Sequence, residues 1–479
     1  MILHRPISRR HVLRTGAALT ALSALSPARM AMADPTGDPF VLRAASGQAA
    51  LRPSPYGPTN VWSYNGSVPG PEIRVRQGDR VLVLAQNGLD EGTTIHWHGI
   101  RTPNAMDGVP FLTQDPIPVD GDFLYEFDAL DAGTFWYHPH QRSSEQVGRG
   151  LYGPLIVEEA DPIRVDRDLT WMLDDWRMTR AGQLSDDFGN RHDAMHGGRI
   201  GNSVTINGEI PERISVQSGE RIRLRLINAA NARIFGLDFG DFEPVVVALD
   251  GQPVTPHAPD GDIVVIGPAM RVDLVIDMTG KPGEVVTVTD AFYEGLEYRL
   301  VDLAYGPDKL RDSVPDWPMD LPPNPLAEPD MASAARHQIV FNGGMMGQMM
   351  MGGGMGSMMG QMREGNMWFI NGEAATGHMM DPLLVLPLGT SHVFEMDNRT
   401  AWHHPIHFHG HSFRVIARNG QPTRYREWQD TVLMAPEERV EIAFAADNPG
   451  DWMFHCHILE HQAAGMMGVI RVEPGTTKT

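Results

Sequence analysis

Short stretches of alternating polar and apolar residues recur along this chain of 479 residues. Residues 221–226 read Arg-Ile-Arg-Leu-Arg-Leu, the two-residue period of a strand that buries one face. Fifty glycines and 37 prolines supply many turns, which favours a β-rich over a helical architecture. We therefore expect an all-β fold.

One strand-and-turn pattern occurs three times. In each copy a short apolar strand runs into an Asn-Gly turn, and a later glycine turn opens the next strand. The Asn-Gly pairs begin at Asn65, Asn207 and Asn371, 142 and 164 residues apart. Repeats of this length are domains and not solenoid units. The sequence predicts three β-sandwich domains, at residues 40–160, 165–312 and 335–475.

Two segments differ in composition from the rest of the chain, one before the third predicted domain and one within it. Residues 313–334 are rich in proline, which suits a semi-extended linker. Residues 343–362 contain nine methionines separated by glycine, glutamine and serine. Because this composition offers little surface to pack, we expect a mobile loop there.

The first 33 residues have the features of an export signal. The twin arginines Arg9 and Arg10 precede a short apolar stretch that ends at Ala31-Met32-Ala33. This arrangement is typical of twin-arginine signals and predicts a periplasmic protein that is exported folded. No later segment has about 18 consecutive apolar residues, so we expect no membrane span.

Charge and cysteine content narrow the function. The net charge of −21 argues against binding to nucleic acids or anionic membranes, and it suits cationic substrates such as metal ions. The single cysteine, Cys456, excludes a disulfide within the chain. Such a residue is either an inert part of the core or a special ligand.

Histidines form four clusters, all in the first and third predicted domains. Residues i and i+2 of a strand project from the same face, so each pair presents two imidazoles together. Neutral imidazole is a good ligand for copper. The sequence therefore predicts a metal site. The clusters are His96-Trp97-His98, His138-Pro139-His140, His404-Pro405-Ile406-His407-Phe408-His409 and His455-Cys456-His457.

The last cluster predicts a second kind of metal site. Cys456 points to the opposite face from its two neighbouring histidines. A thiolate, two histidines and a distant axial methionine are the ligands of a blue-copper electron-transfer site. His461 and Met466 follow Cys456 closely, and His404 is the best candidate for the second histidine. One strand then carries two metal sites on opposite faces.

Together the clusters resemble the copper-binding motifs of the multicopper oxidase family, which includes laccases and bacterial cuprous oxidases. The resemblance covers the whole chain after the export signal. It implies three cupredoxin-like Greek-key β-sandwich domains and four copper ions: one type 1, one type 2 and a type 3 pair. It also implies that one-electron oxidation of a substrate is coupled to the four-electron reduction of O2 to water.

The resemblance also implies a ligand for each copper by matching position. It places the three-copper cluster between the first and third domains, with the second domain as a spacer. His192, His196 and His411 are not expected to be ligands, and His403 is expected to face solvent. The implied ligands are His404, Cys456, His461 and Met466 for type 1, His96 and His407 for type 2, and His98, His138, His140, His409, His455 and His457 for type 3.

Reduction of O2 consumes protons, so acids are expected near the cluster. Asp107 resembles a family carboxylate beside the three coppers, and we expect it to deliver protons. Many bacterial members have a glutamate directly after the position of His461, whereas this chain has Gln462. Asp430 matches a family strand and is expected either to orient a copper ligand or to close a turn.

The electron-donating substrate is either Cu(I) or a small aromatic molecule. We favour Cu(I), because the thioethers of Met345–Met362 are soft ligands that select it. A laccase-like oxidase of phenols is the alternative. It is favoured by residues 400–403, Thr-Ala-Trp-His, which lack the Asp and Met that bacterial cuprous oxidases carry there.

A non-catalytic copper-binding scaffold is a third interpretation of the same motifs. Scaffolds built on this fold typically lose cluster ligands, whereas all twelve are present in this chain. We therefore expect an enzyme, acting as a monomer.

Overall fold

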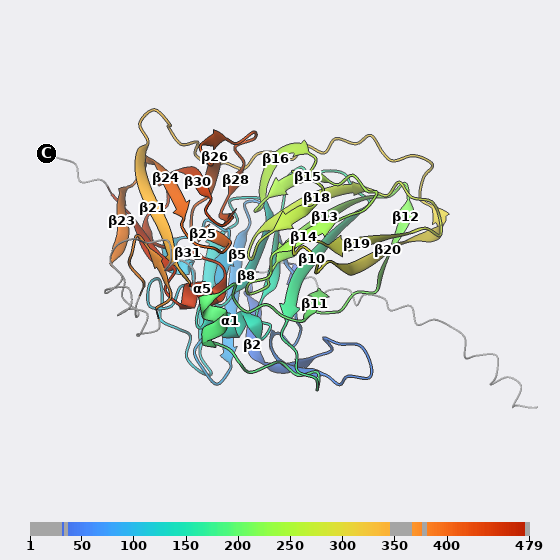
Figure 1. Cartoon of the computed structure of the whole chain (residues 1–479), viewed down its shortest axis with the longest axis horizontal. Helices are drawn as coiled ribbons and strands as arrows, with labels where there is room; N and C mark the ends of the chain where they lie inside the picture. Colours follow the sequence, from blue (N-terminus) through green and yellow to red (C-terminus); the bar gives the residue numbers. More distant parts are fainter. Residues whose placement is uncertain (1–30, 33–36, 345–365, 376–380, 475–479) are drawn as a thin grey trace, which may run out of the picture.

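The computed structural model describes residues 31–32, 37–344, 366–375 and 381–474. Within these ranges almost every element is a β-strand, which confirms the predicted all-β fold. The strands form three pairs of sheets, each pair enclosing its own hydrophobic core. Figure 1 shows the third pair in orange and red at one end, the second in green and yellow at the other, and the first in blue between them.

The predicted export signal, residues 1–33, lies outside the described residues except for Ala31 and Met32. The predicted methionine-rich loop, residues 343–362, lies outside them except for Gly343 and Gly344.

The first sandwich packs the sheet β3-β2-β5-β7 against the sheet β1-β4-β9-β8-β6. Side chains such as Trp97, Phe127 and Leu155 fill the space between them. The strands are β1 (Ala31–Met32), β2 (Phe40–Ala49), β3 (Thr59–Tyr64), β4 (Ile73–Arg76), β5 (Arg80–Gly88), β6 (His96–His98), β7 (Asp122–Asp128), β8 (Gly133–His138) and β9 (Gly153–Glu158).

The second sandwich packs the sheet β11-β10-β13-β18-β15-β16 against the sheet β12-β20-β19-β14-β17. Its strands are β10 (Arg167–Trp176), β11 (Ser203–Ile206), β12 (Arg213–Ser218), β13 (Arg221–Asn228), β14 (Phe235–Asp238), β15 (Val245–Leu249), β16 (Gln252–His257), β17 (Val264–Ile266), β18 (Arg271–Asp277), β19 (Val285–Asp290) and β20 (Tyr298–Lys309).

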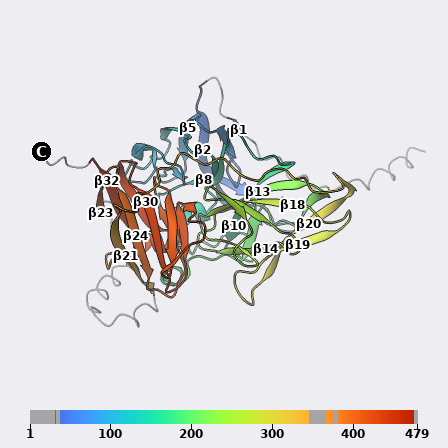
Figure 2. The same ribbon diagram turned by 90° about the horizontal axis from the view of Figure 1, so that it is seen from above.

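The third sandwich packs the sheet β22-β21-β24-β30-β26-β27, with β28 beside β26, against the sheet β23-β32-β31-β25-β29. Figure 2 shows these strands from above. They are β21 (Ala335–Gly343), β22 (Trp368–Ile370), β23 (Pro382–Pro387), β24 (Ser391–Asn398), β25 (His404–Phe408), β26 (Phe413–Arg418), β27 (Gln421–Pro422), β28 (Trp428–Gln429), β29 (Thr431–Met434), β30 (Arg439–Ala445), β31 (Gly450–Cys456) and β32 (Met467–Glu473).

The helices in the described ranges are short and lie at the junctions between sandwiches. They are the 3₁₀-helix η1 (Asn104–Met106) and the α-helices α1 (Ser143–Gly148), α2 (Arg191–Met195) and α5 (Leu459–Ala463). Helix α5 packs against both α1 and α2, so the third sandwich contacts the other two through it. None of the helices in the described ranges has the length and hydropathy that crossing a bilayer requires.

The three predicted Asn-Gly turns are present. Asn65, Asn207 and Asn371 have φ of 52°, 52° and 54°, and the glycine after each also has positive φ. Two consecutive positive φ angles define the type I′ hairpin turn, which asparagine and glycine adopt most readily. Each asparagine side chain also accepts a hydrogen bond from a backbone N–H in a neighbouring strand, those of Arg43, Met172 and Val340 in turn.

Strand β13 differs from the prediction of one exposed face. All eight of its residues are buried, including Arg221, Arg223 and Arg225. Each arginine forms an ion pair with a carboxylate, and Arg223 binds both Glu159 and Asp273. Polar and apolar residues alternate in the same way whether the polar face of a strand is exposed to solvent or packed against protein. The sequence pattern alone therefore does not distinguish a buried polar face from an exposed one.

The proline-rich linker, residues 313–334, contains no helix or strand. It follows the first and second sandwiches and is held by side chains along its length. Leu321 packs against Val247 and Val275 of the second sandwich. Asn324 pairs with the backbone N–H and C=O of Ala132 in the first. These contacts fasten the linker to both sandwiches.

Candidate metal centre

The end of β31 brings three potential ligands together. Cys456 Sγ lies 3.4 Å from His404 Nδ1 and 3.8 Å from His461 Nδ1, and these two nitrogens are 3.2 Å apart. All three residues are fully buried. Met466 is buried in the same core, and its backbone oxygen accepts a hydrogen bond from the Cys456 N–H. One sulfur and two nitrogens are thus within reach of a single ion.

Hydrogen bonds on the far side of each ring turn the nitrogens toward the sulfur. His461 Nε2 donates to the backbone oxygen of His196, 2.6 Å away. His404 Nε2 lies 2.8 Å from the hydroxyl oxygen of Thr400. A proton fixed on Nε2 leaves the lone pair on Nδ1, facing Cys456. Trp368 packs against both rings.

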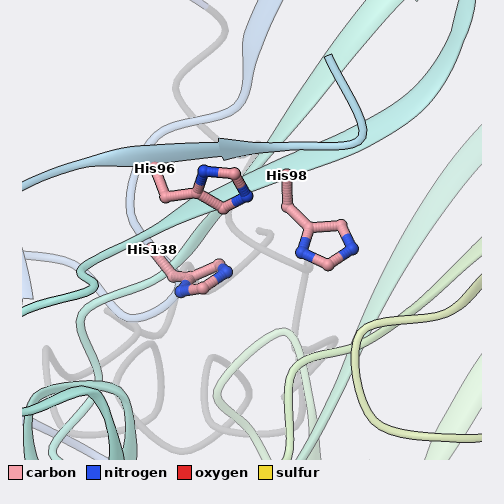
Figure 3. Close-up of side chains that lie close together, drawn as sticks. All are labelled: His96, His98 and His138. Atoms are coloured by element: carbon pink, nitrogen blue, oxygen red, sulfur yellow. The ribbon is translucent and has the colours of Figure 1, made fainter. Parts of the chain in front are cut away.

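The opposite face of β31 borders a cluster of eight imidazoles. His407 on β25 lies opposite His455 on β31, and His96 on β6 lies opposite His138 on β8. Figure 3 shows His96 and His98 on one face of β6 with the ring of His138 close to them. The eight buried residues are the predicted His96, His98, His138, His140, His407, His409, His455 and His457.

Several imidazole nitrogens of this cluster have no hydrogen-bond partner in the part of the chain that the structure describes and are therefore available to bind metal ions. His96 Nδ1 and His407 Nδ1 face the backbone oxygens of Asp107 and Asp430, each at 2.8 Å, so their Nε2 atoms are free for a ligand. A buried polar atom without a partner costs about 1–3 kcal/mol. Among the eight histidines, the buried ring nitrogens without a hydrogen-bond partner in the described residues are His96 Nε2, His98 Nδ1, His140 Nε2, His407 Nε2 and His457 Nδ1.

Burial also sets the protonation state of these rings. Desolvation lowers the pKa of His461 to about 3. Desolvation, with the neighbouring imidazoles, lowers the pKa of each of the other rings for which a shift is resolved. The rings are therefore neutral near pH 7, the form that binds metal. These other rings are His98, His138, His140, His404, His407, His409, His455 and His457.

Asp107 lies beside the cluster, directly after η1. Its carboxylate is buried, with Oδ2 2.9 Å from His409 Nδ1 and Oδ1 3.3 Å from His96 Nδ1. Gln462 lies near another ring, with its amide nitrogen 3.3 Å from His140 Nδ1. A cavity of about 180 Å³ reaches this point, lined in part by Met453 and Met467. The cavity can hold a few water-sized molecules.

Asp430 also contacts the cluster, through His98 and His407. Its carboxylate pairs with Arg271 of β18 in the second sandwich. Burial raises the pKa of Asp430, but Arg271 outweighs it and keeps the pKa well below its ordinary value. Burial and the charge of Asp430 raise the pKa of nearby Asp250 to about 7. Sequence reasoning missed Arg271 and Asp250.

The other histidines in the described ranges lie outside both groups of ligands. His411 is buried, stacks on Phe408 and faces the His409 backbone oxygen. His403 is half-buried, with its ring 5.5 Å from that of Phe292. His196 contributes through its backbone carbonyl, for which a sequence has no signature. The second domain was predicted to be a spacer. Through the His196 carbonyl it also orients the ring of His461, beside Cys456.

Comparison with known proteins agrees with this geometry. Sequence profiles described as multicopper oxidase match residues 47–162, 167–295 and 355–476. The chain is 31% identical over 453 residues to the multicopper oxidase MmcO of Mycobacterium tuberculosis, covering 84% of this chain and 81% of that protein. The crystal structure of a multi-copper oxidase from Pseudomonas thermotolerans has a TM-score of 0.80 and 33% identity, covering 93% of this chain and all of that one.

Other similar proteins differ in what their names describe. A copper resistance protein A homolog from Pseudomonas syringae is 27% identical, covering 85% of this chain and 88% of that protein. A laccase-like oxidase from Ochrobactrum, described as active towards lignin model compounds, is 26% identical with a TM-score of 0.77, covering 93% and 99%. The three profile matches and the relative at 31% identity agree with the two buried ligand groups: this chain belongs to the multicopper oxidase family.

Proposed function

We propose that the chain is a periplasmic cuprous oxidase, exported by the twin-arginine route, that acts as a monomer. It holds four copper ions, with the type 1, type 2 and type 3 ligands that the sequence predicts. The observation that carries the proposal is the end of β31. Cys456, its last residue, faces one ligand group, whereas His455 and His457, the residue directly after the strand, face the other. Bound copper would supply one-electron transfer at the first group and reduction of O2 at the second.

The protein part of this function is to connect the two groups. Cys456 is joined by peptide bonds to His455 and His457, so an electron arriving at its sulfur has a short covalent path to both rings. His455 Nδ1 also lies 2.9 Å from the Cys456 backbone oxygen, which shortens one route further. No moving part is needed between the two groups.

Residues next to the eight-histidine cluster supply the protons for water formation. Asp107 contacts two rings and is the carboxylate to which we assign this role. Gln462 occupies the place where many bacterial relatives have an acid, and an amide does not supply protons usefully at neutral pH. Water in the cavity beside His140 is then the second route to the cluster.

Three observations support Cu(I) as the substrate. The thioethers of Met345–Met362 select a soft cation. The net charge of −21 attracts cations in general. A similar protein bears the name of a copper resistance protein. The balanced reaction takes four Cu(I), one O2 and four protons to four Cu(II) and two waters.

Oxidation of phenols is the second candidate. Residues 400–403 lack the Asp and Met of the bacterial cuprous oxidases, and Trp402 occupies this stretch instead. Trp402 is partly buried and contacts the ring of His196, close to the Cys456 site. A similar laccase-like oxidase is described as active towards lignin model compounds.

Oxygen uptake by the copper-loaded protein separates these functions. Cu(I) and a small phenol are compared at equal concentrations, with Cu(I) autoxidation subtracted. Faster uptake with Cu(I), at four Cu(I) per O2, is the expected result. Faster uptake with the phenol would favour the laccase-like function. Tightly bound copper without oxygen uptake from either would identify a copper-binding scaffold.

A further inference from the structure

Arg271 reaches from the second sandwich to the eight-histidine cluster. It is the first residue of β18 and is fully buried. Its Nη1 donates to Asp430 Oδ1 at 2.8 Å, and its Nη2 donates to Asp430 Oδ2 at 2.5 Å. This two-point contact matches the planar guanidinium to the planar carboxylate and fixes the orientation of both.

The other hydrogen bonds of Arg271 hold it in place. Its side chain donates to the backbone oxygens of Thr134, Ala269 and Asp250. The Asp250 carboxylate accepts from the backbone N–H groups of Arg271, Asp430 and Thr431. The pair is therefore locked to the first, second and third sandwiches at once. A guanidinium with this many fixed acceptors cannot shift without losing several of them.

Asp430, held in this way, contacts two rings of the cluster and orients them. Its Oδ1 lies 3.2 Å from His98 Nε2, and its backbone oxygen lies 2.8 Å from His407 Nδ1. A carboxylate paired with arginine only accepts, so His98 carries its proton on Nε2 and its lone pair on Nδ1. His98 Nδ1 is one of the unpaired nitrogens, whereas His407 leaves its Nε2 unpaired. Asp430 thus decides which nitrogen His98 offers.

Gly99 shows how closely the pair approaches the ligand strand. It follows His98 and has φ of +84°. A Cβ at this position would lie 2.3 Å from Arg271 Nη2 and 2.6 Å from Asp430 Oδ2. Only glycine leaves room for the ion pair directly behind the ligand.

We propose that Arg271 and Asp430 are positioning residues for the three-copper cluster, through which the second domain sets the orientation and tautomer of His98 and the orientation of His407. The proposal rests on the proposed copper function. It predicts that loosening the ion pair weakens copper binding at the eight-histidine cluster and leaves the Cys456 site intact.

Arg223 offers a matched control. It is also buried in the second sandwich and binds two carboxylates, Glu159 and Asp273. None of its recorded contacts is with a histidine of either ligand group. Replacing either arginine with lysine keeps the charge and removes the planar fork. Any effect of general destabilisation should appear in both variants.

The experiment compares Arg271→Lys and Arg223→Lys in the copper-loaded full chain during titration with a chelator. We expect Arg271→Lys to give up cluster copper about 10–100-fold more readily and to change the electron paramagnetic resonance of type 2 copper. Its blue band, from the Cys456 site, should persist. Arg223→Lys should match the wild type in both signals. Equal copper retention and spectra in the two variants would overturn the proposal.

Asp430→Asn keeps the test decisive if Arg271→Lys does not fold. The amide keeps the shape of the side chain but lacks the charge that holds both the guanidinium and the His98 proton. We expect the same weakened cluster copper with the blue band retained, and unchanged cluster copper would overturn the proposal. Failure of the proposed function is distinct, because the wild-type chain would then lack copper or oxygen uptake before any variant is made.

Discussion

Cys456 is the one thiol in the chain, and its sulfur lies between the rings of His404 and His461. Copper–thiolate charge transfer gives such sites their blue colour. Cys456→Ser changes one buried atom, so the fold and the eight-histidine cluster should remain. We expect the variant to lose the blue absorption and the oxygen uptake while keeping the circular dichroism spectrum of the wild type. A blue, active variant would refute the assignment of this site.

Asp107 is predicted to deliver protons to the cluster. Asp107→Asn retains the size of the side chain and can still accept one hydrogen bond, but it cannot release a proton at neutral pH. Loss of a positioned general acid typically costs about 10²–10⁴-fold in rate. We expect steady-state oxygen uptake to fall by about a hundredfold, with copper content unchanged.

An anaerobic measurement provides the control for Asp107→Asn. Without O2, substrate electrons should bleach the blue colour of the variant as fast as that of the wild type, because Asp107 does not contact the Cys456 site. Slow bleaching would place the defect in electron entry. Unchanged steady-state turnover would remove Asp107 from the reaction.

At the residue scale, the sequence predicted neighbours that lie only one or two positions apart on a strand. The His-x-His pairs and Cys456 follow from the two-residue period of a strand. Asp107 was found only through the family resemblance, since its partner His409 is 302 residues away. Arg271 and Asp430 are 159 residues apart. An arginine that begins a regular strand gives no local sign that it will be buried against a metal site.

The methionine-rich segment of residues 345–362 is the element whose function can be tested by deletion. Nine thioethers would raise the local Cu(I) concentration without taking part in the chemistry. Deletion should therefore raise KM for Cu(I) several-fold with a smaller change in kcat. A small phenol should be oxidised as fast as by the intact chain, or faster. Oxygen-uptake kinetics with both substrates measure this.

A serine-substituted control separates the effect of the methionine sulfurs from the effect of segment length. Replacing the nine methionines with serine keeps the length and the glycine spacing, so it should reproduce the KM effect of the deletion. Copper content should stay at the wild-type value in both variants. Identical Cu(I) kinetics in all three proteins would favour the laccase-like function.

Element prediction succeeded where local chemistry decides the backbone and failed where long-range packing does. The Asn-Gly turns were predictable because asparagine and glycine are the residues that adopt positive φ readily. The complete burial of β13 was not, because its three arginines find carboxylates from other parts of the chain. Helix α2 has only five residues, too few for a helical period to appear.

At the scale of the whole molecule, the eight histidines come equally from the first and third sandwiches. Metal bound there would join the two, so copper should stabilise the assembled chain. At free copper about 100 times Kd, binding contributes about 2.7 kcal/mol. The unfolding entropy of a chain of 479 residues is about 1 kcal/mol/K, so we expect removal of copper to lower the melting temperature by about 3 °C, measured by scanning calorimetry.

The Cys456→Ser variant is the control for this effect. It retains the eight histidines that join the two sandwiches, so its copper-loaded form should keep most of the stabilisation. An equal melting temperature for copper-loaded and copper-free wild type would show that the sandwiches are held together without the metal.

The hydrogen bond from His461 to the His196 backbone carbonyl has a kinetic consequence. A metal that gains and loses an electron tends to pull its ligands to new positions, and every displacement adds to the activation barrier of the transfer. His461 is fastened by the second sandwich, and His404 is fastened by Thr400. With both rings held from behind, the reorganisation energy of the site should be small. Electron transfer to the site should then be fast even from a reductant whose potential is only slightly lower than that of the site.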